Sequence, residues 1–222
     1  MITRRVGSVT SRLAVAAVLL AGLTGCADGL RPGAAAIVDG SVISMSRADD
    51  ATAVYCQVAV YSAQQQSAEP LGSADVRRQA VSELIAARVA DDLTEQEGLR
   101  IPDSEWRFDR EQRRQVLGAL PNADPDLAVD VLEEGQRTYA VAQALGERAS
   151  GEEATAANAD ELQAAGREIL AEAIAAADVA VDPRFGLGDD GTQRASTGSL
   201  SVAGGALDDA GADVVPSTQQ CV

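Results

Sequence analysis

One short stretch constrains the fold more than any other part of the chain. Residues 35–50 read AAIVDGSVISMSRADD, and two weakly alternating apolar segments in it flank an Asp39-Gly40 pair. Such a pair is typical of a tight β-hairpin, because both residue types tolerate the positive φ angles that the turn requires. The sequence therefore predicts two strands over about 36–44, with a helix directly after them.

Helical spacing fills most of the remaining chain. Ser46 and Asp49 have the spacing of a capping box, with Asp in place of Glu, which predicts that the first helix begins there and runs to about Gln66. Ser73 is predicted to cap the second helix, and Gly98 to end it. Three further helices are bounded by proline, glycine or polar residues and are predicted over about 102–120, 125–149 and 159–177.

The composition decides how these helices can pack. Aromatic residues make up 3% of the chain, so the core must consist mostly of Ala, Leu, Val and Ile at close helix spacing. The clearest apolar face belongs to the second helix and consists of Val81, Leu84, Ile85, Val89 and Leu93. The predicted fold class is mainly α, a bundle of about five helices with a small β element.

The first 25 residues have the layout of a lipoprotein signal peptide. Three arginines precede a short apolar run, LAVAAVLLAG, and small residues follow it. The run is shorter than the roughly 20 apolar residues that a membrane-spanning helix needs. It ends in LTGC, which resembles a bacterial lipobox and implies cleavage before Cys26, acylation of its thiol and a lipidated tether over 26–35. The alternatives are an ordinary signal peptide with a chance cysteine and a twin-arginine signal.

The mature chain is strongly acidic. The signal holds three of the 18 basic residues and none of the 34 acidic ones, which leaves 15 basic residues and a formal charge of −19. Such a surface repels phosphate backbones and anionic lipid headgroups. We therefore expect no nucleic-acid partner, and membrane attachment only through the acyl chains on Cys26.

The end of the chain combines a cysteine with a tail of low complexity. Cys56 and Cys221 remain once Cys26 carries lipid, and two thiols in an oxidising compartment are expected to form a disulfide. The alternative is that Cys56 is a small apolar helix residue and Cys221 is free. Residues 187–222 are otherwise rich in Gly, Ser, Asp and Thr, which predicts a disordered tail in which SLSVAGG could add a brief edge pairing.

Several segments, taken in order, resemble one family of foldases. The hairpin and first helix are followed by RRQAVSELIAARVADDLTEQEGLRIPDSEW at 77–106, and the helical part closes with VAVDPRFG at 179–186. This order resembles the N-terminal domain of SurA-type periplasmic chaperones and of the related PrsA and trigger-factor-like proteins, with a domain over 36–186. The resemblance implies that the early strands, about 36–44, pair with a strand at about 178–182. The alternative is an unrelated acidic helical lipoprotein with one Asp-Gly turn.

The catalytic part of that family is missing from this chain. The family's parvulin-type prolyl isomerase domain depends on histidines, and this sequence has none. The count also excludes a histidine base, a Ser-His pair and histidine-held zinc. Residues 122–133 carry acids at offsets similar to a calcium loop, but Leu127 stands where glycine is needed and Pro125 begins a helix. We therefore expect no enzyme activity, no cofactor and no metal.

Two non-catalytic functions agree with these features. The first is a chaperone-like protein that binds unfolded or exported polypeptides, and the second is an adaptor for one specific envelope protein. Trp106 and Phe108 are the candidate client-binding residues, and their alternative role is packing that is half core and half loop. Either protein is expected outside the cytoplasm, anchored to the cell membrane by its N-terminal lipid.

Overall fold

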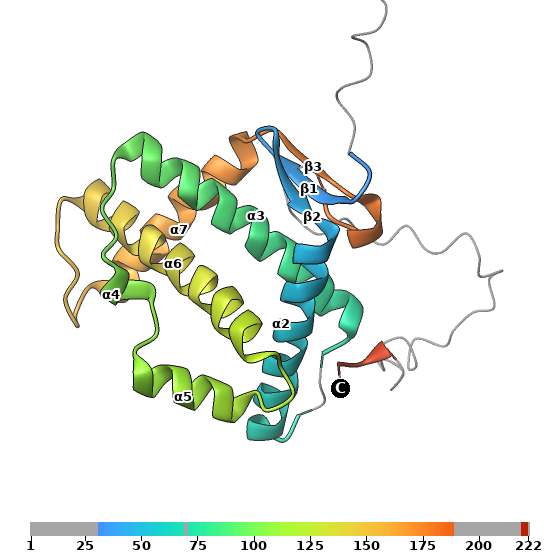
Figure 1. Ribbon diagram of the computed structural model, residues 1–222. Helices are drawn as coiled ribbons and strands as arrows, with labels where there is room; N and C mark the ends of the chain where they lie inside the picture. Colours follow the sequence, from blue (N-terminus) through green and yellow to red (C-terminus); the bar gives the residue numbers. More distant parts are fainter. Residues whose placement is uncertain (1–30, 69–70, 189–218, 222) are drawn as a thin grey trace, which may run out of the picture.

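The computed structural model describes residues 31–68, 71–188 and 219–221, and it is mainly helical with a small sheet at one end of the helices (Figure 1). The elements are β1 (Ala34–Val38), β2 (Ser41–Ser44), α2 (Met45–Gln66), α3 (Ser73–Glu97), α4 (Asp103–Trp106), α5 (Arg110–Ala119), α6 (Pro125–Ser150), α7 (Ala159–Ala176), β3 (Val179–Val181) and the 3-10 turn η2 (Pro183–Phe185). Five helices in the described residues have 10 or more residues, which confirms the predicted fold class.

β1 is the central strand of a three-stranded antiparallel sheet in the order β2–β1–β3. Asp39 and Gly40 form the hairpin turn with φ angles of 46° and 80°, the left-handed geometry expected of an Asp-Gly pair. On its other edge β1 pairs with β3, where Ile37 lies opposite Ala180. The backbone N–H of Asp39 also donates to the carbonyl of Asp178 at 2.9 Å. The predicted pairing between the early strands and the strand after the last helix is therefore confirmed.

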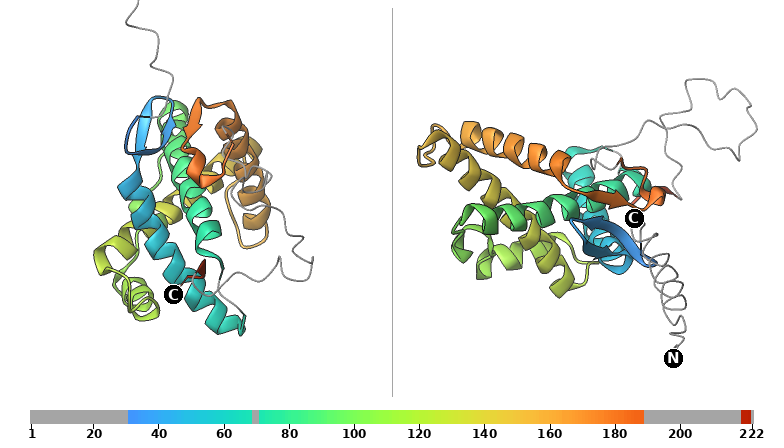
Figure 2. Two further views of the ribbon diagram at one scale, coloured as in Figure 1. Left: turned by 90° about the vertical axis from the view of Figure 1, so that its right-hand side faces the viewer. Right: turned by 90° about the horizontal axis from the view of Figure 1, so that it is seen from above.

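α3 is the central helix of the molecule (Figures 1 and 2). It packs against α2, α6, α7 and β1, so partners cover more than one of its sides. Its buried residues are Val76, Ala80, Val81, Leu84, Ile85, Ala87, Val89 and Ala90. The buried surface is wider than the single face that the sequence predicted, because small alanines between the larger side chains let neighbouring helices approach from both sides.

The end of α6 and the start of α7 lie with their backbones in close contact. A Cβ added to Gly166 would overlap the carbonyl group of Ala142, and a Cβ added to Gly146 would overlap that of Leu162. Glycine is therefore needed at both positions because the backbone of the neighbouring helix leaves no space for a side chain, and not because the residue has a positive φ angle. This contact is how a core poor in aromatic side chains still packs tightly.

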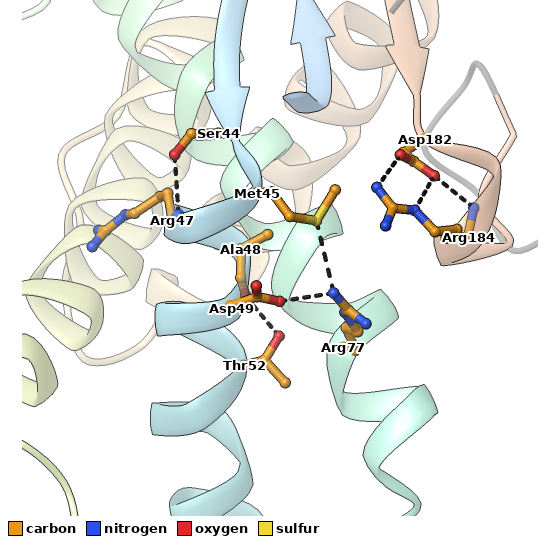
Figure 3. Close-up of polar contacts among 9 residues, drawn as sticks. All are labelled: Ser44, Met45, Arg47, Ala48, Asp49, Thr52, Arg77, Asp182 and Arg184. Atoms are coloured by element: carbon orange, nitrogen blue, oxygen red, sulfur yellow. Dashed lines mark hydrogen bonds and ion pairs between the residues drawn. The ribbon is translucent and has the colours of Figure 1, made fainter. Parts of the chain in front are cut away.

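Two helices begin at residues other than the predicted ones. The first is capped by Ser44, not Ser46, and the Ser44 hydroxyl accepts from the backbone N–H three residues later at 3.1 Å (Figure 3). The second helix begins after Gly72 and has no side-chain cap, so Ser73 is its first residue and not its cap. In both cases strand pairing sets the boundary, since Ser44 ends β2 and Gly72 pairs with Gln220.

The predicted third helix, about 102–120, is two helices. α4 ends at Trp106, and Asp109 starts α5 with a reciprocal capping box. The N–H of Gln112 donates to the Asp109 carboxylate at 2.8 Å, and the N–H of Asp109 donates to the Gln112 side chain at 2.9 Å. The motif DREQ carries this signal in the sequence, and it overrides the apolar spacing across the break.

Arg77 of α3 connects the helices to the region around the sheet (Figure 3). Its guanidinium donates to Asp49 on the first turns of α2 at 2.7 Å and lies 5.0 Å from the ring centroid of Phe185 in η2. Just after β3, the side chain and backbone N–H of Arg184 donate to Asp182, which lowers the pKa of that carboxyl. The segment that follows β3 is therefore fixed by its own Arg184–Asp182 contact and by the contact of Phe185 with Arg77 of α3.

Cys56 of α2 and Cys221 form a disulfide, as predicted, with their Cα atoms 5.1 Å apart. Cys221 is buried, its backbone N–H donates to the carbonyl of Leu71 at 3.2 Å, and Gly72 pairs with Gln220. The end of the chain therefore lies beside the connection between α2 and α3. A disulfide is typical of proteins in an oxidising compartment outside the cytoplasm.

The predicted signal peptide over 1–25, the lipid site at Cys26 and the SLSVAGG segment at 199–205 lie outside the described residues. β1 begins at Ala34, two residues inside the predicted tether. Leu187, at the start of the predicted tail, is buried against the core. Among the helices of the described ranges, none combines the length and the apolar character needed to cross a bilayer.

Candidate functional site

Trp106 lines a hollow of about 240 Å³ between α2, α3, α4 and α6, here named the Trp106 hollow. The indole is half-buried, with the guanidinium of Arg107 4.4 Å and that of Arg137 5.9 Å from its ring centroid. Phe108 is also half-buried but does not line the hollow, and its backbone N–H donates to Glu133 at 3.1 Å. The structure therefore separates the two aromatic residues that the sequence suggested as one patch.

The charges around the Trp106 hollow are paired with one another. Arg47 of α2 pairs with Asp130 at 2.7 Å and also with Glu134, both on α6. Burial disfavours the charge of Arg47, but the two carboxylates outweigh this effect and raise its pKa above the ordinary value. Arg137 pairs with Asp91 of α3. Such pairing suits a contact that joins helices better than a site for a charged ligand.

Replacement of Glu133 by alanine is expected to destabilise the protein. Glu133 is 6% exposed, and its carboxylate lies 3.8 Å from the guanidinium of Arg107 and 3.6 Å from that of Arg113. These donors and a backbone N–H of the α4–α5 link would lose their acceptor, so the free energy of unfolding in urea should fall by about 1–3 kcal/mol. Glu111→Ala removes an exposed ion pair with Arg114 and an exposed hydrogen bond from Gln115, and it should cost less than Glu133→Ala, at most about 1 kcal/mol. Equal losses in the two variants would contradict the role assigned to Glu133.

A second hollow, of about 360 Å³, lies between α3, α6 and α7 and is mostly apolar; it is named here the Tyr139 groove. These three helices lie side by side in Figure 1. The lining includes Glu83, Tyr139, Ala142, Gln163, Arg167 and Leu170. Tyr139 is 50% exposed, although most large apolar side chains of the described residues are covered. The volume falls in the range of about 300–1,000 Å³ that is usual for ligand pockets.

Two polar side chains that line the Tyr139 groove, Gln163 and Glu83, lack a hydrogen-bond donor or an ion-pair partner among the described residues. Gln163 is 3% exposed, and its Oε1 accepts no hydrogen bond. An unpaired buried oxygen costs about 1–3 kcal/mol, so the stability of the free protein does not explain a glutamine here. Glu83 is half-buried and makes no ion pair with any described residue, and burial raises the pKa of its carboxyl. Two acceptors that line the groove, the Oε1 of Gln163 and the carboxylate of Glu83, therefore lack a bonded donor or ion-pair partner among the described residues.

Replacement of Glu83 by glutamine is expected to stabilise the free protein at neutral pH. Burial holds the pKa of Glu83 above its unfolded value of about 4.5, so its ionisation opposes folding as the pH rises through the folded pKa. Below the unfolded pKa both states bind the proton, and the advantage of Glu83→Gln should disappear. Thermal unfolding of both proteins between about pH 4 and about pH 7 measures this difference. Glu95→Gln, on the exposed face of the same helix, is the control, and equal melting temperatures of wild type and Glu83→Gln at neutral pH would contradict the prediction.

The sequence did not single out the residues of the Tyr139 groove. Gln163, Leu170 and Ile174 recur at helical spacing, which could have put Gln163 on the apolar face of α7. Glu83 stands in the interior of the apolar second helix, next to Leu84. That α3, α6 and α7 leave a groove open between these residues depends on tertiary packing, for which the sequence carries no local signal.

Comparisons with protein-family models, with curated proteins and with solved structures found no match to this chain. Within the part of the chain that the structure describes, no three His, Cys, Asp or Glu side chains are grouped to hold a metal ion. The resemblance to SurA-type chaperones therefore stays a prediction from the sequence motifs.

Proposed function

We propose that this protein is a lipid-anchored, extracytoplasmic, chaperone-like protein that binds unfolded or exported polypeptides without catalysing a reaction. The observation that supports this most is a helical bundle, braced by a head-to-tail sheet, that leaves an apolar groove open beside an exposed tyrosine. The sequence motifs imply the same sheet for SurA-type chaperone domains. An open apolar groove suits weak binding of unfolded chains, and the formal charge of −19 on the mature chain keeps complexes soluble.

The proposed anchor brings the folded part close to the membrane. The eight residue-to-residue steps from Cys26 to Ala34 can span at most about 28 Å when fully extended. In this proposal the acyl chains on Cys26 hold the protein, and the Cys56–Cys221 disulfide agrees with an oxidising compartment. Cys26→Ser should remove the acyl mass and move the protein from the membrane fraction to the soluble fraction. A membrane-bound Cys26→Ser protein would contradict anchoring by lipid.

Suppression of aggregation tests the chaperone-like function. The mature protein in mild detergent is mixed with several unrelated unfolded proteins, and aggregation is followed by light scattering. We expect suppression of all of them at near-equimolar ratios. Aggregation that proceeds unchanged would overturn this function.

An adaptor for one envelope protein is the second candidate. The small volume of the Tyr139 groove and the fixed polar groups of Gln163 and Glu83 favour it, because they suit one defined sequence. An adaptor would not suppress aggregation, yet it would retain a single partner from solubilised envelopes. Turnover of a proline-containing tetrapeptide would contradict both non-catalytic functions.

A further inference from the structure

We propose that the Tyr139 groove binds an extended peptide segment in which aliphatic side chains neighbour a lysine or arginine. This inference rests on the proposed function and deepens it, because it names the chemistry of the bound polypeptide. Three features of the groove carry it: an apolar floor, a buried acceptor and an unpaired acid.

The apolar floor selects aliphatic side chains. Ala142 and Leu170 are buried groove residues, and Ile174 lies beside them on α7. Tyr139 stands half in solvent at the edge of the groove, where a bound chain would cover it. Covering such apolar surface is favourable by roughly 25 cal/mol per Å².

The acceptor selects an extended backbone. Gln163 is almost completely buried and lines the groove, and its Oε1 has no donor. A rotation of the Gln163 side chain that turns this buried oxygen toward the groove would let it accept from a backbone N–H of the bound peptide. A helical peptide engages its own N–H groups, so only an extended segment offers a free one along its length.

The unpaired acid selects a basic neighbour. Glu83 faces the groove from α3 without a counterion among the described residues. Arg167, across the groove on α7, is exposed and forms no ion pair with Glu83 in the described residues, so it does not neutralise that acid. A lysine or arginine of the peptide would pair with Glu83 and could lie over the ring of Tyr139. The acidic surface of the whole chain attracts the same kind of peptide.

Fluorescence anisotropy with short labelled peptides tests the proposal on the mature protein. The probe is an unstructured glycine-serine peptide with leucines and one lysine at its centre, and its matched partner has norleucine in place of lysine. Gln163→Met removes the acceptor but keeps the shape of the side chain, so it should melt at or above the wild-type temperature and weaken both peptides about three- to tenfold. Glu83→Gln should weaken the lysine peptide by about two- to fivefold and leave the norleucine peptide unchanged.

Matched controls use exposed residues of α3. Gln96→Met and Glu95→Gln make the same chemical changes outside the groove and should leave both affinities unchanged. If Gln163→Met and Glu83→Gln bind both peptides like wild type, the groove is not the site and this inference is overturned, while suppression of aggregation would still support the proposed function. If aggregation is also not suppressed, the proposed function fails as well.

Discussion

Loss of the Cys56–Cys221 disulfide is expected to lower the free energy of unfolding by up to roughly 5 kcal/mol. The two cysteines are 165 residues apart, and a cross-link over so long a loop removes much conformational entropy from the unfolded chain. Around the disulfide, the described end of the chain contributes the Gly72–Gln220 bridge, the hydrogen bond from Cys221 to Leu71 and the buried side chain of Cys221. The cross-link is expected to provide most of the stabilising effect, because it acts on the whole unfolded chain.

Calorimetry of the wild type and of a Cys56→Ala/Cys221→Ala variant, each with and without reductant, measures this effect. The variant should melt well below the oxidised wild type, and reductant should change only the wild type. Mass spectrometry without reductant verifies the bridge in the starting material. A difference below about 1 kcal/mol between the oxidised wild type and the variant would contradict the entropic account.

Replacement of Gly166 by alanine is expected to cost about 3 kcal/mol or more, a large effect for one added methyl group. The new Cβ would overlap the backbone carbonyl of Ala142, which cannot rotate away as a side chain can. The two helices must therefore separate, and the close backbone contact between the end of α6 and the start of α7 is lost. Gly146→Ala should have a similar effect, because its Cβ would meet the carbonyl of Leu162.

Gly118→Ala provides the matched control for these substitutions. Gly118 lies in helix α5 with no atom within 4 Å of an added Cβ, so alanine there should stabilise the protein by about 0.5–1 kcal/mol. Urea denaturation of all three variants measures the contrast. The Gly146→Ala/Gly166→Ala double variant should lose less than the two single losses combined, since the first substitution already moves the helices apart. Stability of Gly166→Ala equal to that of Gly118→Ala would show that the α6–α7 pair adjusts freely.

Much of the fold could be predicted because it depends on short local sequence motifs, such as turns and helix ends, or on a choice among few possibilities, such as the pairing of two cysteines. The Asp39-Gly40 turn, the Asp124-Pro125 helix start and the glycine end of α3 at Gly98 all follow from backbone preferences of single residues. The strand pairing came from the resemblance to a family, and the disulfide from the count of cysteines. Errors arose where two local signals competed, as at Asp109, or where a helix follows directly on a hairpin strand, as at Ser44, the last residue of β2.

The candidate site was harder to predict because it depends on what surrounds each residue. Trp106 and Phe108 were the client-binding candidates from the sequence, yet the charged residues around Trp106 form ion pairs with one another. Gln163 and Glu83 look ordinary in a sequence with many polar helix residues. What makes them candidate binding residues is that they are buried or half-buried without a partner. This situation arises only from the packing of α3, α6 and α7.

The position of β1 between its two partners decides when this protein can finish folding. Asp39, at the end of β1, bonds to a residue 139 positions later, just before β3. If the chain is exported as proposed above, a translocation channel delivers it with the N-terminus first, so β1 and β2 arrive early and β3 last. Throughout that transit one edge of β1 has open backbone donors and acceptors, which other strands can occupy. In that case the native structure would form after release from the channel, when the final short strand arrives to complete the sheet.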